Sequence, residues 1–216
     1  MTLLELQDLT LRSAGTTRVA SVNADVQPGR VTAVLGANGS GKSSLLALMA
    51  GQMPPTSGQV LLQGEAVHRM KFLERARQLA WLGQSTPGAD AYPVRDVVSW
   101  GRTCWRGIPA AAKVDSSDLM ERLGIAHLVD KPLGSLSGGE RQRVHLARIW
   151  LQDAPITLLD EPDAALDTTG REILHQLIID STATGKTIVI VTHDRSWAHE
   201  VADEVWVMDA GTLTAQ

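Results

Sequence analysis

One stretch near the N-terminus limits which folds this chain can adopt. An apolar, β-branched run from Val31 to Leu35 leads into a glycine-rich loop, Gly36 to Ser43, and an apolar helical pattern follows at once. The loop has the spacing G-x-x-x-x-G-K-S, which binds phosphate when a strand precedes it and a helix follows. Its backbone N–H groups and the positive end of the helix dipole can hold a phosphate chain. An ordinary glycine-rich turn is the alternative, but both flanks favour the phosphate loop.

The side chains in this loop have expected roles of their own. Lys42 can reach the outer phosphates, and the hydroxyl of Ser43 can ligate Mg²⁺. The other predicted nucleotide contacts are the remaining loop residues and the next serine: Gly36, Ala37, Asn38, Gly39, Ser40, Gly41 and Ser44.

The composition excludes several other classes of protein. The chain has 216 residues, enough to bury a substantial core, and its net charge of −4 gives no general attraction to nucleic acid or anionic membranes. No apolar run approaches the roughly 20 residues that cross a bilayer, and the N-terminus lacks the features of a secretion signal. Cys104 is the only cysteine, which excludes an internal disulfide and fits a reducing compartment. We expect a cytosolic chain unless a partner holds it elsewhere.

The remaining patterns indicate an α/β chain with a helical insertion. Strands predicted at 3–12, 19–26 and 31–35 follow one another too closely for helices between the first two, which implies an antiparallel portion. From residue 135 onward, continuous apolar strands alternate with helices, as in a parallel sheet covered on both faces. We expect a single domain over 1–216. Its α/β core, with the N-terminal antiparallel part, covers 1–84 and 150–216, and its helical subdomain covers about 85–149.

Two adjacent carboxylates, Asp160 and Glu161, end the apolar strand predicted at 156–159. Buried strands seldom end in adjacent acids without a partner, because unpaired buried charge is costly. Beside the phosphate loop, Asp160 would hold Mg²⁺ through water, and Glu161 could polarise the attacking water as general base. A solvated acidic turn is the alternative when these two residues are taken alone.

Two further polar residues follow predicted strands. His193 comes directly after the strand predicted at 187–192, where it is a candidate contact for a γ-phosphate, although a lone histidine is more often structural. Gln84 follows the strand predicted at 79–82, where the helical insertion begins, and could simply cap a loop. Because ligands bind beyond the carboxyl ends of parallel strands, one crevice can collect these strand-end residues.

A second helix start, Ser137-Gly138-Gly139-Glu140, also has two interpretations. Ser137 and Glu140 have the spacing of a capping box. Two glycines are unfavourable in a first helical turn, each by up to ~1 kcal/mol relative to alanine, so helix stability alone does not explain them. Bare N–H groups at a helix N-terminus would instead make a second anion site, formed by Ser137, Gly138 and Gly139.

Taken in order, these motifs resemble those of the ATP-binding subunits of ABC transporters. The resemblance covers nearly the whole chain and rests on GANGSGKS, Gln84, LSGGE, ITLLDE, Ala164-Ala-Leu-Asp167 and His193. It implies a P-loop NTPase (RecA-like) core with an antiparallel β subdomain and an inserted all-helical subdomain. It also implies ATP and Mg²⁺ as cofactors, and a head-to-tail dimer with two ATP molecules between the subunits.

The resemblance assigns roles to individual residues. The phosphate loop of one chain would grip ATP, while residues 137–139 of the other chain would cover the γ-phosphate. Gln84 would contact Mg²⁺ and the water, and Asp167 would communicate across the dimer. Hydrolysis would open the dimer and move polytopic membrane subunits, whose short cytosolic helices dock near residues 84–106. A location at the cytoplasmic face of the cell membrane follows.

Within this family, Tyr92 to Arg102 resembles a stretch in the ATPases of metal-chelate importers, which carry iron siderophores, haem or cobalamin. That similarity implies a periplasmic or extracellular solute-binding protein as a further partner. The segment from Ala147 to Pro155 is also similar to haem-exporter ATPases of cytochrome c maturation, so export remains open. A soluble ABC ATPase acting on DNA or ribosomes is a third alternative. The acidic balance and the lack of a long coiled-coil insertion argue against it, and no nucleic acid partner is expected.

Three departures from the family pattern affect these expectations. The first aromatic residue is Phe72, so a guanidinium plane from Arg12 or Arg18 would replace the aromatic ring that normally stacks on adenine. Ala164 replaces a common serine, and the few residues after Gly211 leave no room for a regulatory domain. None of these changes removes a hydrolytic residue, so we expect an active ATPase and not a nucleotide sensor. The expected catalytic residues are Lys42, Gln84, Glu161 and His193.

Overall fold

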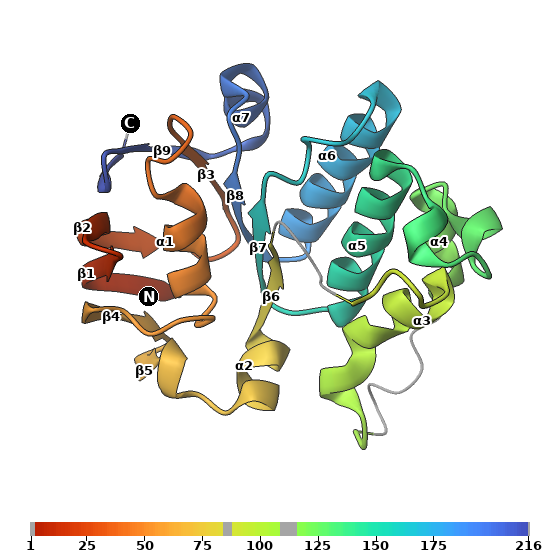
Figure 1. Ribbon diagram of the computed structural model, residues 1–216, viewed down its shortest axis with the longest axis horizontal. Helices are drawn as coiled ribbons and strands as arrows, with labels where there is room; N and C mark the ends of the chain where they lie inside the picture. The colour runs from red at the N-terminus through yellow and green to blue at the C-terminus, as the bar shows by residue number, and fades with distance from the viewer. Residues whose placement is uncertain (1–2, 84–87, 109–115, 216) are drawn as a thin grey trace.

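A six-stranded sheet crosses the middle of the computed structural model, which describes residues 3–83, 88–108 and 116–215 (Figure 1). Its strands are β3 (Val31–Leu35), β6 (Leu79–Leu82), β7 (Ile156–Asp160), β8 (Thr187–Val191), β9 (Glu204–Asp209) and β10 (Thr212–Ala215). They lie in the order β10-β9-β3-β8-β7-β6, and every neighbouring pair is parallel except β10 with β9. β3, β7 and β8 are buried at each position because both faces of the sheet are covered.

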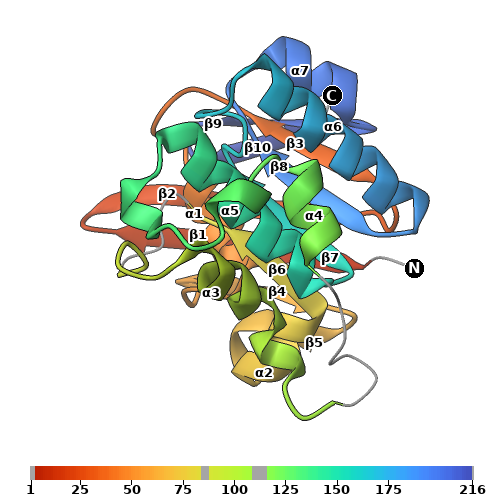
Figure 2. The same ribbon diagram turned by 90° about the vertical axis from the view of Figure 1, so that its right-hand side faces the viewer.

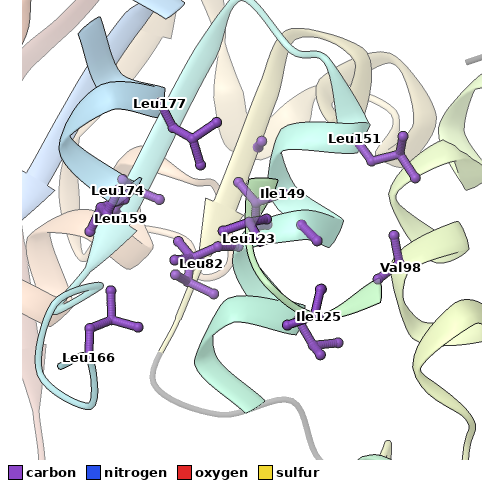
Figure 3. Packing of buried hydrophobic residues seen from close by; sticks show 14 of the residues in the cluster. Leu82, Val98, Leu123, Ile125, Ile149, Leu151, Leu159, Leu166, Leu174 and Leu177 are labelled. Atoms are coloured by element: carbon purple, nitrogen blue, oxygen red, sulfur yellow. The ribbon is translucent and has the colours of Figure 1, made fainter. Parts of the chain in front are cut away.

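Two hydrophobic clusters cover the opposite faces of this sheet, because successive strand residues point to opposite sides. The α-helices of the described residues are α1 (Lys42–Met49), α2 (Phe72–Gln78), α3 (Val94–Ser99), α4 (Ser117–Arg122), α5 (Gly138–Gln152), α6 (Thr168–Ala183) and α7 (Arg195–Val201). Leu158 of β7 belongs to the cluster that includes α1, and Leu159 belongs to the cluster that includes α5 and α6. Figure 1 shows α1 on one side of the sheet and α5 and α6 on the other. Figure 3 shows Leu159 beside Leu174 of α6.

A second, four-stranded sheet is entirely antiparallel and shares a hydrophobic cluster with α1. Its strands are β1 (Leu4–Ser13), β2 (Thr16–Val26), β4 (Ser57–Leu62) and β5 (Glu65–Ala66), in the order β2-β1-β4-β5. This sheet confirms the antiparallel portion predicted from the close spacing of the first strands. The sequence patterns did not predict β5 and β10. β5 has only two residues, and β10 reads Thr-Leu-Thr-Ala, which contains no apolar run.

Between β6 and β7, the regular elements of the described residues are helices and 3-10 turns, apart from one isolated bridge between Pro93 and Pro132. Figure 2 shows α3 and α4 packed beside α5. The sequence predicts one helix from Val94 to Gly101, but α3 changes into a 3-10 turn after Ser99. The 3-10 turns of the described residues are Val67–Arg69, Trp100–Trp105, Ala126–Leu128 and Leu133–Ser135.

These elements confirm the predicted fold class, an α/β core with an antiparallel part and helices between two strands of the core. Gly101 shows how closely the helices pack, because a Cβ there would lie 2.2 Å from the carbonyl oxygen of Arg148 on α5. In the part of the chain that the structure describes, every helix is too short or too polar to span a bilayer.

Candidate functional site

The phosphate loop and two of the predicted strand-end residues meet at the carboxyl ends of β3, β7 and β8. Gly36 follows β3, Asp160 ends β7, and His193 is the second residue after β8. The backbone N–H of Glu161 donates to the carbonyl oxygen of Val191 at 2.9 Å, which joins the end of β7 to the end of β8. The parallel sheet therefore brings these residues to one edge, where ligands of such sheets bind.

The loop between β3 and α1 needs glycine at two positions for steric reasons. A Cβ on Gly36 would lie 2.2 Å from the carbonyl oxygen of Met208, and a Cβ on Gly41 would lie 2.1 Å from that of Arg18. Gly41 also has a φ of 109° and stands at the N-cap of α1, where no side chain in the described part of the chain caps the helix. The N-terminus of α1 thus has no capping side chain among the described residues, and its partial positive charge favours an anion.

Lys42 is held inside this loop by the backbone. The residue is 5 % exposed, and its Nζ donates to the carbonyl oxygens of Gly36 at 2.8 Å and Ala37 at 2.9 Å. A buried ammonium needs such acceptors, because an isolated buried charge is costly. The positive charge is therefore fixed beside the path that phosphate oxygens would take into the loop.

Ser43 and Asp160 form the oxygen pair predicted to hold Mg²⁺. Ser43 Oγ donates to Asp160 Oδ1 at 3.1 Å. Burial raises the pKa of Asp160, and the nearby charge of Glu161 adds to this rise. The hydrogen bond from Ser43 and the positive charge of Lys42 oppose it. A hard cation at these oxygens would favour the charged carboxylate. Hydroxyl and carboxylate oxygens fit Mg²⁺, which takes its other ligands from water and bound phosphates.

No group of three or more histidine, cysteine, aspartate and glutamate side chains in the described residues could hold a metal ion. A cation between Ser43 and Asp160 would therefore depend on phosphate and water for most of its ligands. This is the usual situation for Mg²⁺ at nucleotide sites, since the ion dehydrates reluctantly.

A cavity of about 300 Å³ opens on the phosphate loop. It is lined by Arg18, Asn38, Gly39, Gly41, Lys42, Ser43, Ser44 and Glu161. Gly36, Ala37 and Ser40 lie in the same loop without lining this cavity. Of the two arginines proposed for adenine, Arg18 lines the cavity, whereas Arg12 is exposed on β1 and does not. The sequence could not separate them, because the difference depends on how β2 packs against the loop.

The other residues proposed for hydrolysis differ in how the structure places them. His193 is exposed in the turn between β8 and α7. Gln84 lies outside the described residues. The sequence patterns did not single out Asp163, which is fully buried two residues after Glu161. The available signal was a third acid so close to the strand end, in Asp-Glu-Pro-Asp.

The start of α5 contains the predicted capping box. Ser137 N and Oγ donate to Glu140 Oε2 at 2.9 and 2.7 Å, and Glu140 N donates back to Ser137 Oγ at 3.3 Å. The Ser137 hydrogen bonds lower the pKa of Glu140. Packing explains the glycine at position 139, because a Cβ there would lie 3.0 Å from the carbonyl oxygen of Ala165. A Cβ on Gly138 would meet no described atom within 4 Å. Capping and packing thus account for Ser137 and Gly139, but no contact with the described residues explains Gly138.

The loop after Glu161 packs against α5 before it enters α6. Gln142 Nε2 donates to the carbonyl oxygen of Pro162 at 2.9 Å, and Arg143 Nη1 lies 3.5 Å from Asp167 Oδ1. Asp167 also caps α6 by accepting a 2.8 Å hydrogen bond from the N–H of Gly170. The Gln142 hydrogen bond and the Arg143–Asp167 pair therefore connect α5 to the loop that follows Glu161.

Known proteins share both the sequence and the fold of this chain. The model of the ABC transporter family matches residues 19–164. The hemin import ATP-binding protein HmuV of Nocardia farcinica is 39% identical over 192 residues, which cover 88% of this chain and 67% of the relative. The cobalamin import ATP-binding protein BtuD of Halobacterium salinarum is 36% identical over 215 residues, which cover 97% of this chain and 54% of the relative.

Solved structures of low sequence identity have the same fold. The ATP-binding subunit of an ABC transporter has a TM-score of 0.90 at 21% identity, covering 100% of this chain and 90% of that chain. A dimeric ATP-binding cassette in a post-hydrolysis state, bound to ADP and Pi, has a TM-score of 0.85 at 24% identity, covering 99% of this chain and 97% of that chain. The fold agrees with the family match and with the identity to the curated relatives, and the chain belongs to the ABC transporter family.

Proposed function

We propose that this chain binds and hydrolyses ATP to drive a membrane transporter that imports haem or a related metal chelate. The observation that carries the ATPase proposal is the convergence of Lys42, Ser43, Asp160 and Glu161 around the phosphate loop. The import proposal is supported by the relatives, whose names describe import ATP-binding proteins for hemin and cobalamin. An iron siderophore belongs to the same proposed cargo class.

The residues of the loop bind and orient the phosphates in this proposal. Lys42 exchanges the two loop carbonyls for phosphate oxygens, and the bare N-terminus of α1 adds its partial charge. Ser43 and Asp160 would hold Mg²⁺, which neutralises phosphate charge when it is bound. Arg18 lines the cavity and is the better placed of the two arginines for the base, although Arg12 remains a candidate.

The residues beyond the strand ends activate the attacking water and contact the γ-phosphate in this proposal. Glu161 lines the cavity, and its carboxylate accepts a proton from the attacking water. His193, at the end of β8, contacts the γ-phosphate. Gln84 is proposed to contact Mg²⁺ and the water, and to link the site to the helices that follow it.

A second copy of the chain would complete the site. Ser137, Gly138 and Gly139 do not line the phosphate-loop cavity, and α1 and α5 cover opposite faces of the sheet (Figure 1). We therefore infer that one nucleotide contacts both helix N-termini when they come from different chains. In the proposed head-to-tail dimer, Gly138 meets the γ-phosphate and Asp167 lies at the contact between subunits.

The proposed transporter also includes membrane subunits and a solute-binding protein outside the membrane. Polytopic permease subunits would hold this chain at the cytoplasmic face and dock near residues 84–106. The described part of that segment presents an aromatic side chain, because Tyr92 is 48 % exposed and packs edge-on against Trp100 with ring centroids 5.1 Å apart. Aromatic side chains of this kind are enriched at protein interfaces.

The Glu161→Gln variant tests the ATPase and the dimer together. A general base typically contributes a factor of about 10²–10⁴, so turnover should fall by that range while ATP binding persists. The variant should form an ATP-dependent dimer, measured by light scattering after size exclusion. Adding Lys42→Ala to it should prevent the dimer, because the phosphate contact is lost. Undiminished hydrolysis would reject Glu161 as the base, and the absence of a dimer with ATP, both alone and with the permease, would reject the shared site.

Reconstitution tests the proposed direction and cargo. The chain is co-expressed with its membrane subunits and placed in vesicles, and uptake of haem, cobalamin and an iron siderophore is measured with the solute-binding protein present. ATP-dependent movement of one of these chelates toward the side that holds this chain is expected. Movement away from that side would establish export.

A further inference from the structure

Arg171, on α6, joins the two segments that flank the proposed reaction site. Its Nη1 lies 2.9 Å from Asp194 Oδ2, and its Nη2 lies 3.5 Å from Asp163 Oδ2. Asp194 directly follows His193, and Asp163 lies two residues after Glu161. One guanidinium, whose planar donors can serve two acceptors, therefore bridges the loop after the proposed base and the turn that carries the histidine.

Asp163 is a buried carboxylate that pairs with this guanidinium. The residue is 0 % exposed; its Oδ2 accepts from Thr192 Oγ1 at 3.4 Å, while its Oδ1 has no hydrogen-bond partner in the described part of the chain. Thr192 is also buried, and its Oγ1 accepts from the N–H of Asp194 at 3.1 Å. Removing the cation from a buried ion pair is strongly destabilising, because the remaining charge is left uncompensated.

The backbone at Glu161 gives an independent reason to expect such support. Its φ is 49°, a left-handed conformation that is uncommon for a residue other than glycine. A conformation of this kind costs of order 1–3 kcal/mol and persists only where the surrounding structure fixes it. The hydrogen bond to Val191 fixes one side of Glu161, and the Asp163–Arg171 pair fixes the chain two residues later.

We propose that Arg171 is a positioning residue for ATP hydrolysis: by holding Asp163 and Asp194, it fixes Glu161 relative to His193. This inference rests on the proposed ATPase function. Arg171 does not line the phosphate-loop cavity, so it acts through the two loops and not on the nucleotide. Its loss would leave both carboxylates without their shared cation and release the two loops from each other.

The kinetic test compares three variants of the full chain. Arg171→Met should lower kcat for ATP at least about tenfold and leave KM within about twofold, because the phosphate loop is intact. Arg171→Lys keeps the charge and should recover part of kcat. In Asp163→Asn combined with Arg171→Met, the buried charge is gone, so kcat should exceed that of Arg171→Met alone.

Hydrogen exchange tests the bridge without turnover. In Arg171→Met, the amides of Glu161 and Asp194 should exchange faster, because they donate to Val191 O and Thr192 Oγ1 at the two ends that the bridge joins. A wild-type chain that fails to hydrolyse ATP would reject the proposed function. The amide exchange rates would still test whether Arg171 holds the two loops together.

Arg122→Met is the matched control. It removes the pair between Arg122 Nη2 and Asp180 Oδ2, 2.6 Å apart on the exposed side of α4 and α6, and should change neither kcat nor the exchange of Glu161 and Asp194. Arg171→Met with unchanged exchange at these two amides would overturn the proposal. The proposal would also be overturned if kcat fell only in proportion to the amount of folded protein and if Asp163→Asn did not restore any of it.

Discussion

The N-termini of α1 and α5 both present glycines and a helix dipole, but the chain completes them in opposite ways. At α1 the N-cap is Gly41, no side chain of the described residues caps the helix, and a cavity of about 300 Å³ lies in front of it. At α5 the N–H and the hydroxyl of Ser137 both donate to Glu140. The first helix end can receive an anion from solution, whereas the second already has an anion supplied by its own chain.

This difference predicts an order of binding. A phosphate at α1 replaces only the two loop carbonyls that accept from Lys42, whereas a phosphate at α5 must compete with Glu140 for Ser137. One exchanged hydrogen bond is worth about 1 kcal/mol net, so the competition weakens binding at α5 without preventing it. Nucleotide is therefore expected to bind the loop of one chain first and the α5 end of a second chain afterwards.

Of the variants that test this comparison, Gly41→Ala is expected to lower ATP affinity the most. An added methyl group would lie 2.1 Å from the carbonyl oxygen of Arg18, in a backbone with φ 109°, so the loop must open. We expect ATP affinity, measured by calorimetry, to fall at least about 100-fold, or about 3 kcal/mol. Gly39→Ala is the matched control: the φ of Gly39 is 80°, but no described atom lies within 4 Å of the added Cβ, so this variant carries only a strain of about 1–2 kcal/mol. Equal affinities in the two variants would contradict the steric explanation.

Lys42→Ala should have the next largest effect. A hydrogen bond to a charged group contributes about 1.5–3 kcal/mol, so ATP affinity should fall roughly 10- to 150-fold. The loss should appear in the monomer, because Lys42 belongs to the loop that binds nucleotide first. An ATP affinity equal to that of the wild type would show that the phosphates do not displace the two loop carbonyls.

The predictable part of this site is local in sequence. Lys42 and Ser43 stand between a strand and a helix, so the motif alone places them in one loop. Asp160 could be added because parallel strands bring their carboxyl ends to one edge of a sheet. The Ser43 Oγ to Asp160 Oδ1 contact of 3.1 Å spans 117 residues, yet it needs only that the strands before these residues belong to one parallel sheet, which the alternating pattern predicts.

The rest of the site depends on side-chain contacts between elements that no periodicity relates. From the sequence alone, Arg171 is indistinguishable from a solvent-exposed charge on a helix. In the structure it is half-exposed on α6 and contacts the buried Asp163. Gly139 reads as part of an anion site, although it lies where a Cβ would come 3.0 Å from the carbonyl oxygen of Ala165. Arg18 and Arg12 differ only through the packing of β2 on the loop, which the sequence leaves open.

Ser137→Ala should weaken the ATP-dependent dimer without changing ATP binding by the monomer, which distinguishes the roles of the two helix N-termini. Loss of an N-cap serine costs about 1 kcal/mol, and the hydroxyl proposed to meet the γ-phosphate is lost with it. ATP binding by the monomer should stay unchanged. In the Glu161→Gln background, the ATP-dependent dimer should need about fivefold more protein, as followed by light scattering. A dimer as strong as that of Glu161→Gln alone would contradict a role for the α5 end.

Glu140→Gln should have the smallest effect on binding, and it should strengthen the dimer where Ser137→Ala weakens it. Glutamine keeps the spacing of the capping box but removes the charge that competes with phosphate. In the Glu161→Gln background, the dimer should therefore form at a lower protein concentration, by up to about fivefold. A weaker dimer would show that Glu140 supports the second site and does not compete with its ligand.

The pH dependence of Glu140→Gln separates competition from a general loss of helix stability. Ser137 hydrogen bonds lower the pKa of Glu140 below its ordinary 4.5, so its contribution to the stability of α5 is complete above pH 4.5 and is lost as the pH falls through the lowered pKa. Glutamine has no such titration. The Tm of the wild type should therefore exceed that of Glu140→Gln at pH 7, and the difference should narrow as thermal melts are taken below pH 4.5. A difference that stays constant with pH would mean that the carboxylate does not hold Ser137 in solution, and the helix end would then be as open to phosphate as that of α1.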